Sequence, residues 1–164
     1  MSTSRTYDTP MGPFTAIVDA DGAVLASGWT AEPADLVSLI HPTLRPTELR
    51  EGELGMVGDA ILAYHGGDLS AIDDVSVRQR SGAFLEHAWD VLRAVPAGAP
   101  LTYTEYAAKS GNPAAVRAAA SACARNAAAL FVPCHRVLRS DGTLGGFRWG
   151  LGIKRALLLH EAVR

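Results

Sequence analysis

The sequence predicts an α/β N-terminal domain with a small sheet and helices, followed by a mainly α C-terminal domain that contains a helix-turn-helix. Short apolar runs on both sides of an Asp-Gly turn indicate β-strands near the N-terminus. Apolar residues at three- and four-residue intervals indicate helices in the second half. A polar segment at 66–79 separates these patterns, so we place the domains at residues 1–79 and 80–164.

The N-terminal half begins with an expected β-hairpin. Its strands are the apolar runs 14–18 and 23–29, and the Asp-Gly pair between them is a strong turn signal. Apolar side chains then recur at helical spacing over 33–40 and 56–64, which predicts two helices. A hairpin followed by two helices predicts the small α/β unit.

The C-terminal half begins with an expected helix over 84–95, which has a broad apolar face and ends at Pro96. Thr102 and Glu105 have the spacing of a capping box, so a short helix should begin there.

A second short helix should follow, with Asn112 as its N-cap, Pro113 at its first position and 114–126 as its body. Helix, tight turn and helix in close succession are the layout of a helix-turn-helix, which also occurs in proteins that never contact DNA. The side chains of 114–126 are nearly all tiny. This favours close packing on neighbouring helices, or approach to the narrow minor groove of DNA.

The composition, 48% hydrophobic and 20% charged, is typical of a globular protein. The chain has no run of about 18 apolar residues and no apolar signal core at its N-terminus, so we expect a cytoplasmic protein without a membrane partner. Its cysteines, Cys123 and Cys134, lack the clustered histidines of a zinc site. We expect two free thiols and no bound metal.

The formal net charge of −2 conceals an asymmetry. Residues 1–79 hold four basic against twelve acidic side chains, whereas residues 80–164 hold eleven basic against five acidic ones. The basic half favours contact with a polyanion, although an ordinary solvated surface explains the charges equally well.

The segment 133–137 places Cys134 beside His135 and Arg136. The thiolate is the nucleophilic form of cysteine, and nearby cations or a histidine acting through water can lower a thiol pKa toward neutrality. The alternative is a small buried core residue, because free cysteine is among the most buried residue types.

Several motifs occur together in the second half of the chain. They are Gly98, Thr102-Tyr103, Gly111-Asn112-Pro113, Val116-Arg117-Ala118, Asn126, 133–137, Gly142, 145–150, Lys154-Arg155 and 157–161. In this combination residues 80–164 resemble the O6-alkylguanine-DNA alkyltransferases, also called methylated-DNA–protein-cysteine methyltransferases. Segment 148–150 is most similar to the C-terminal part of bacterial Ada. The resemblance implies a ribonuclease-H-like N-terminal domain and a winged-helix-like C-terminal domain.

The resemblance also implies a reaction. An alkyl group would pass irreversibly from O6-alkylguanine, and from O4-alkylthymine, in double-stranded DNA to Cys134. Each molecule would act once, as a monomer and without a cofactor. The chain shows no glycine-rich nucleotide fingerprint of the kind that would hold a dissociable cofactor.

Five residues match the catalytic positions of that family. Cys134 would accept the alkyl group, His135 would take its proton through a water, and Glu161 would orient His135. Tyr103 would hydrogen-bond the departing guanine, and Asn126 would brace the active-site turn. The alternatives are a solvated helix residue for Glu161 and a helix C-cap for Asn126.

Further residues match positions that contact DNA or form the alkyl pocket. Because the lesion lies inside the base stack, the nucleotide must be flipped out, and Arg117 would fill its place. The other expected DNA contacts are Tyr103, Thr104, Asn112, Ala114, Ala118, Ser121 and Ser140. The expected pocket residues are Val137, Phe147 and Arg148.

Two other functions stay open at this level. One is a lesion sensor or DNA-binding regulator that recognises alkylated DNA without repairing it. The other is a cysteine hydrolase, which lacks support because no oxyanion-forming glycine pair lies beside the thiol.

We predict that Arg117→Ala weakens repair of alkylated duplex DNA but leaves the reaction with free alkylguanine nearly unchanged, because only the duplex requires a side chain in the vacated stack. Transfer rates on the two substrates, measured side by side, test this. Equal losses on both would refute the role of Arg117.

Overall fold

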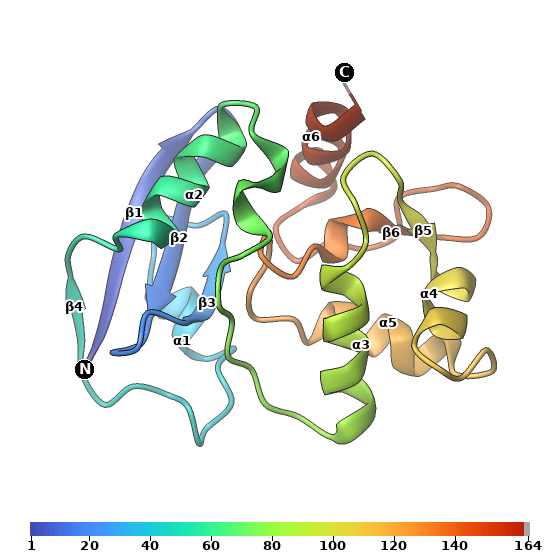
Figure 1. Cartoon of the computed structure of the whole chain (residues 1–164), viewed down its shortest axis with the longest axis horizontal. Coiled ribbons are helices and arrows are strands. Elements are labelled where there is room, and N and C mark those ends of the chain that lie inside the picture. The colour runs from blue at the N-terminus through green and yellow to red at the C-terminus, as the bar shows by residue number, and fades with distance from the viewer. Residues whose placement is uncertain (163–164) are drawn as a thin grey trace. The chain divides into compact units, whose positions relative to one another are not determined.

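The computed structural model describes residues 1–162, which form two compact units (Figure 1). Unit 1 contains Met1–Arg80 together with Ala127–Phe131. Unit 2 contains Ser81–Asn126 and the chain from Val132 onward. None of the helices in the described part of the chain has both the length and the apolar character needed to cross a membrane.

Unit 1 is built on a four-stranded sheet of order β3-β2-β1-β4. Its strands are β1 (Ser2–Thr9), β2 (Gly12–Val18), β3 (Val24–Gly28) and β4 (Leu49–Glu51). The antiparallel pairing of β2 with β3 confirms the predicted hairpin. The strand β1 was not predicted from the sequence. It pairs antiparallel with β2 and parallel with β4. Its inward side chains at one end are Ser2 and Ser4, so the usual apolar alternation is absent.

The helices of unit 1 are α1 (Ala34–Val37), α2 (Met56–His65) and the 3-10 helix η1 (Leu69–Ile72). The predicted helix at 56–64 is confirmed, whereas the one predicted at 33–40 is a single turn. The helix α2 packs closely on β1 (Figure 1). A Cβ added at Gly58 would lie 2.2 Å from the Tyr7 hydroxyl, so this contact requires glycine.

Unit 2 contains four α-helices and a two-stranded parallel sheet among its residues up to 162. Its elements are α3 (Ala83–Arg93), β5 (Leu101–Thr102), α4 (Tyr103–Lys109), α5 (Val116–Ala124), the 3-10 helix η2 (Cys134–Arg136), β6 (Val137–Leu138) and α6 (Leu151–Ala162). The capping box is confirmed, since the Thr102 hydroxyl accepts from the Glu105 N–H and the Glu105 carboxylate from the Thr102 N–H.

The small side chains of α5 let it lie close to its neighbours. The Trp89 indole N–H on α3 donates to the Ala122 carbonyl at 2.8 Å, and Ala119 is fully buried. The Tyr106 hydroxyl on α4 donates to the Ala88 carbonyl at 2.7 Å. Two buried aromatic side chains therefore join α3, α4 and α5 through backbone carbonyls.

The predicted start of α5 was wrong. The helix begins at Val116, with Ala115 at the N-cap position, and Asn112 does not cap it. Instead, the Asn112 side-chain oxygen accepts from the Ala114 N–H at 3.1 Å, which makes a local turn around Pro113. Asparagine bonds its own backbone two residues on as readily as it caps a helix, so the local pattern did not distinguish these states.

We predict that Thr102→Ala lowers the free energy of unfolding by about 1 kcal/mol, because the first turn of α4 loses its capping hydroxyl. Urea unfolding at pH 7 measures the change. Thr47→Ala, at an exposed loop position, is the control and should stay close to wild type. Equal stability of the two variants would contradict a capping role.

Candidate active site around Cys134

Cys134 begins η2, the short 3-10 turn that follows Pro133. Its N–H donates to the Val132 carbonyl at 2.8 Å, which holds the start of the turn. The residue is 8% exposed, and the next two residues are more deeply buried. The candidate nucleophile thus lies just below the surface of unit 2.

Burial raises the pKa of the Cys134 thiol above its ordinary value. A hydrogen bond from the Asn126 side chain and the charges of Lys154 and Arg148 lower it, but they do not outweigh the loss of hydration. Of the two possibilities that the sequence left open, a lowered thiol pKa and a buried cysteine, the pKa shift agrees with burial. Cys134 is a protonated thiol at pH 7, and a base must remove its proton before the sulfur can attack.

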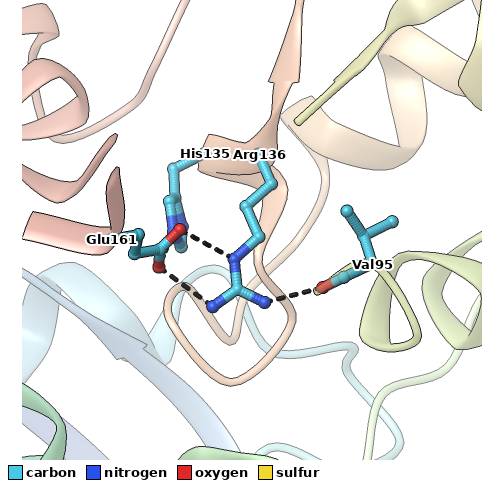
Figure 2. A network of polar contacts seen from close by, with 4 residues as sticks. All are labelled: Val95, His135, Arg136 and Glu161. Carbon is cyan, nitrogen blue, oxygen red and sulfur yellow. Dashed lines mark hydrogen bonds and ion pairs between the residues drawn. The ribbon is translucent and has the colours of Figure 1, made fainter. Parts of the chain in front are cut away.

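The side chains of His135, Arg136 and Glu161 form a buried network (Figure 2). The His135 Nε2 lies 2.7 Å from Glu161 Oε2. Arg136 donates to both carboxylate oxygens of Glu161, at 2.9 Å each, and its third bond goes to the Val95 carbonyl at 2.7 Å. Glu161 is 1% exposed, so it is not a solvated helix residue.

The network sets the charge state of each member. Burial raises the pKa of Glu161, but hydrogen bonds and charges from His135 and Arg136 outweigh it and lower that pKa to about 2. Burial lowers the pKa of His135, although Glu161 acts in the opposite direction. At pH 7 the carboxylate is therefore ionised and the imidazole neutral.

A neutral imidazole has one nitrogen that donates and one that accepts. Because Nε2 of His135 faces an ionised carboxylate, it carries the proton. Nδ1 is buried and has no hydrogen-bond partner among residues 1–162. His135 therefore presents a basic nitrogen, held in one tautomer by Glu161.

Lys154 had no role assigned from the sequence, and Arg136 was considered only as a cation beside the thiol. Lys154 is fully buried, and its ammonium donates to the Val137 carbonyl at 2.8 Å and the Gly146 carbonyl at 3.3 Å. It thereby joins the two ends of the loop that follows Cys134. Lys154, Leu157 and Glu161 are the buried residues of α6, and their helical spacing was the signal that could have identified them.

Asn126 follows α5, whose C-cap is Arg125. Its side-chain amide donates to the Val132 carbonyl at 2.7 Å, the same carbonyl that accepts from the Cys134 N–H. The residue is 4% exposed. Asn126 thus contacts the backbone of the turn that carries the thiol.

Tyr103 is the first residue of α4 and is half-buried. Burial raises its pKa to about 12, so the hydroxyl is protonated and can donate a hydrogen bond. A Cβ added at Gly145 would lie 3.3 Å from the Tyr103 ring, and Gly145 has a φ of +74°. Both the close approach to the Tyr103 ring and the positive φ therefore favour glycine at position 145.

The predicted DNA contacts lie mainly at the surface of α4, α5 and the loop after β6. Arg117, Asn112 and Ala114 are exposed, and Ala118 and Ser121 are half-buried. The hydroxyls of Thr104 and Ser140 lie 2.8 Å apart, so the fold brings together two residues that are distant in sequence.

The three predicted pocket residues differ in exposure. Val137 is fully buried in β6, Phe147 is half-buried, and Arg148 is exposed and donates to the Ala124 carbonyl. A surface pocket of about 300 Å³ elsewhere on unit 2 is lined by apolar residues that include Leu138 and Leu158, and none of the predicted site residues lines it. Residues 1–162 contain no group of three or more side chains suited to hold a metal ion.

Comparisons with known proteins agree with this geometry. A family model described as "6-O-methylguanine DNA methyltransferase, DNA binding domain" matches residues 83–163. The chain is 36% identical over 160 residues to the methylated-DNA–protein-cysteine methyltransferase of Mycobacterium tuberculosis, covering 98% of this chain and 92% of that protein. It is 51% identical over 83 residues to the bifunctional transcriptional activator/DNA repair enzyme Ada of Escherichia coli, covering 51% of this chain but 23% of Ada.

Solved structures show the same fold. The O6-methylguanine methyltransferase of Mycobacterium tuberculosis has a TM-score of 0.79 and 32% identity, with 99% of this chain and 93% of that chain covered. The complex of Mycobacterium tuberculosis OGT with DNA has a TM-score of 0.80 and 29% identity, with 98% and 92% covered.

We predict that acid destabilises the protein in two stages. The lowered pKa of His135 contributes stability above about pH 6.5, the unfolded value, which is lost as the pH falls through the folded value. Glu161 contributes stability above about pH 4.3, which is lost as the pH falls toward its folded value of about 2. Urea unfolding across pH 8 to pH 3 measures the decline.

Glu161→Gln should cost about 3–5 kcal/mol at pH 7, because Arg136 is left buried without a countercharge. The double variant Glu161→Gln/Arg136→Met removes both charges and should recover part of that loss. A single variant as stable as wild type would contradict the pairing.

Proposed function

Because the chain belongs to the methylated-DNA–protein-cysteine methyltransferase family, we propose that it repairs alkylated DNA by moving the alkyl group onto its own Cys134. One observation carries this assignment to residues: a thiol followed directly by a buried, neutral histidine that an ionised carboxylate holds in one tautomer. This arrangement is an activated nucleophile with an orienting third group.

The proposed reaction is a single displacement at carbon. His135 Nδ1 takes the thiol proton through a water, and the sulfur of Cys134 attacks the alkyl carbon. The carbon–sulfur bond forms as the carbon–oxygen bond at guanine O6 breaks, and the electron pair of that bond leaves with the base. The protonated hydroxyl of Tyr103 hydrogen-bonds the departing guanine. The product is a thioether, which no neighbouring side chain can cleave, so each molecule acts once.

Glu161 and Arg136 contribute to this step by stabilising the positive charge that forms on His135. When His135 becomes protonated, its positive charge lies 2.7 Å from the Glu161 carboxylate, which stabilises it. Arg136 keeps that carboxylate ionised and fixed in a bidentate pair. The buried base can therefore accept a proton despite its low pKa.

The proposed substrate is double-stranded DNA that bears O6-alkylguanine, and also O4-alkylthymine. In this proposal α4 and α5 form the helix-turn-helix of a winged-helix-like domain, and α5 enters the minor groove, where Arg117 replaces the flipped nucleotide. Thr104 and Ser140 are proposed to contact one phosphate, because their hydroxyls lie side by side at the surface. The exposed Asn112 and Ala114 and the half-buried Ala118 and Ser121 lie on or beside the same helix.

Several finer assignments belong to the same proposal. Residues 1–79 would act as a ribonuclease-H-like supporting domain and residues 80–164 as the DNA-binding and alkyl-accepting domain. Val137, Phe147 and Arg148 would border the alkyl group, with Arg148 close enough for its charge to lower the pKa of Cys134. The protein would act as a monomer in the cytoplasm and without a cofactor.

A second candidate is a sensor that binds alkylated DNA without repairing it. The raised pKa of the Cys134 thiol favours it, because a protonated thiol does not attack carbon. The neutral histidine that follows Cys134 favours transfer, because it supplies the missing base.

We predict that incubation with duplex DNA containing O6-methylguanine adds one methyl group to the peptide that carries Cys134, as measured by intact-protein and peptide mass. Cys134→Ser should bind the same DNA and stay unmodified, whereas Cys123→Ser should still be methylated at Cys134. Wild-type protein that binds the lesion but gains no mass would identify a sensor.

A further inference from the structure

A five-residue segment, Ala127–Phe131, belongs to unit 1 although the residues on both sides of it belong to unit 2. The chain leaves unit 2 after Asn126 and re-enters it at Val132, two residues before Cys134. Each residue of the segment is at most 3% exposed. The backbone that leads to the nucleophile is therefore fixed among residues from the first 80.

Two residues of unit 1 hold this segment by hydrogen bonds. The Ser27 N–H on β3 donates to the Ala127 carbonyl at 2.8 Å, and the Ser27 hydroxyl donates to the Ala129 carbonyl at 2.7 Å. The Gln79 side-chain oxygen accepts from the Ala127 N–H at 2.9 Å. Ser27 is fully buried, so water does not compete for its hydroxyl.

The end of the segment is held by packing. Leu130 has a φ of +79°, the only positive φ of a non-glycine residue among residues 1–162, and it is fully buried. The Phe131 ring lies 6.4 Å from the Phe14 ring. A strained backbone persists only where its surroundings stabilise it, so the packing around Leu130 must favour this conformation.

The two residues that flank the segment contact each other and the thiol turn. Asn126 donates to the Val132 carbonyl at 2.7 Å, and that carbonyl also accepts from the Cys134 N–H. A further hydrogen bond from the Asn126 side chain reaches the Cys134 sulfur. Displacement of the segment would move Asn126 and Val132, to which it is covalently joined, and with them the sulfur.

We infer that Ser27 is a positioning residue for alkyl transfer: its hydroxyl and N–H fix the segment Ala127–Phe131, and through it the direction of the Cys134 sulfur. This inference rests on the proposed function only in naming the reaction that the sulfur performs. Gln79 supports the same segment from its first residue. A sulfur misdirected by about 1 Å loses much of its transfer rate, because a displacement requires aligned atoms.

The test compares Ser27→Ala with a matched control in the same sheet. Thr15→Val removes another fully buried hydroxyl, which donates to the Thr30 carbonyl at 2.6 Å and lies 2.7 Å from the Thr6 hydroxyl, both outside the segment. We expect Ser27→Ala to slow methyl transfer at saturating O6-methylguanine duplex by roughly tenfold, with the Kd for DNA within about twofold of wild type. Thr15→Val should leave the transfer rate within about twofold, even where the two variants lose equal stability.

A second pair of variants, at Gln79, tests the inference if Ser27→Ala does not fold. Gln79→Met removes the acceptor of the Ala127 N–H, whereas Gln79→Glu keeps an oxygen at that place. We expect the methionine variant to lose transfer rate and the glutamate variant to retain it. Melting temperatures of all variants confirm that folded protein is compared.

A reaction without DNA separates this inference from the proposed function. Alkylation of Cys134 by iodoacetamide, followed by peptide mass across pH 7 to pH 12, reports the thiolate directly. We expect the pH midpoint for Cys134 to rise in Ser27→Ala, because the Asn126 bond that favours the thiolate is loosened, and to stay at the wild-type value in Thr15→Val.

The results of these experiments test the proposed function and the role of Ser27 separately. A wild-type protein that gains no methyl group refutes the proposed function, while the iodoacetamide midpoints still test Ser27. Transfer rates and midpoints of Ser27→Ala and Gln79→Met that equal wild type would overturn the positioning role. A loss in Thr15→Val as large as that in Ser27→Ala would also overturn it, since general stability would then explain both.

Discussion

The buried carboxylate of Glu161 is the charge on which the site depends. It lies on α6, 1% exposed, and its two oxygens take the bidentate guanidinium of Arg136 and the His135 imidazole. A charge so deeply buried is tolerated only when it is paired and hydrogen-bonded. The pairing therefore fixes α6 against η2. Arg136 also donates to the Val95 carbonyl, which lies just after α3, so the same network holds this part of the chain.

Burial shifts the pKa values of Cys134 and His135 in opposite directions. Loss of hydration raises the pKa of Cys134 and lowers the pKa of His135, so at pH 7 the first is a neutral thiol and the second a neutral imidazole. Burial favours the neutral form of each group, and a protonated thiol is a poor nucleophile. In the proposed reaction, proton transfer accompanies the attack on the alkylated base, and Glu161 would stabilise the imidazolium that forms.

Side chains from distant elements donate hydrogen bonds to backbone carbonyls in the segments that precede and follow Cys134 in sequence. Lys154 on α6 takes the carbonyls of Val137 and Gly146, and Ser27 on β3 takes that of Ala129. Each donor is fully buried, so each bond is protected from competition by water. Ser27 thus holds the segment before Cys134, and Lys154 holds the loop after it. These bonds stabilise backbone that has little regular secondary structure of its own.

Much of the local structure follows from the sequence by itself. The hairpin of β2 and β3, the capping box at Thr102 and the helix at 83–93 depend on residues a few positions apart, whose preferences act before any tertiary contact. The triplet Cys134, His135 and Arg136 likewise indicates nucleophilic chemistry from adjacent residue types. Local rules failed at Asn112, where a turn and a cap use the same side chain.

Only the tertiary structure decided which partners these residues have. The bonds of Glu161 to His135 and Arg136 join positions 26 and 25 residues apart, and the bond from Ser27 to Ala129 joins positions 102 apart. The direction of the Cys134 pKa shift likewise depends on burial, which adjacent residues do not set. The sequence determined which side chains were present, and the packing of distant elements determined their hydration, their charge states and their contacts.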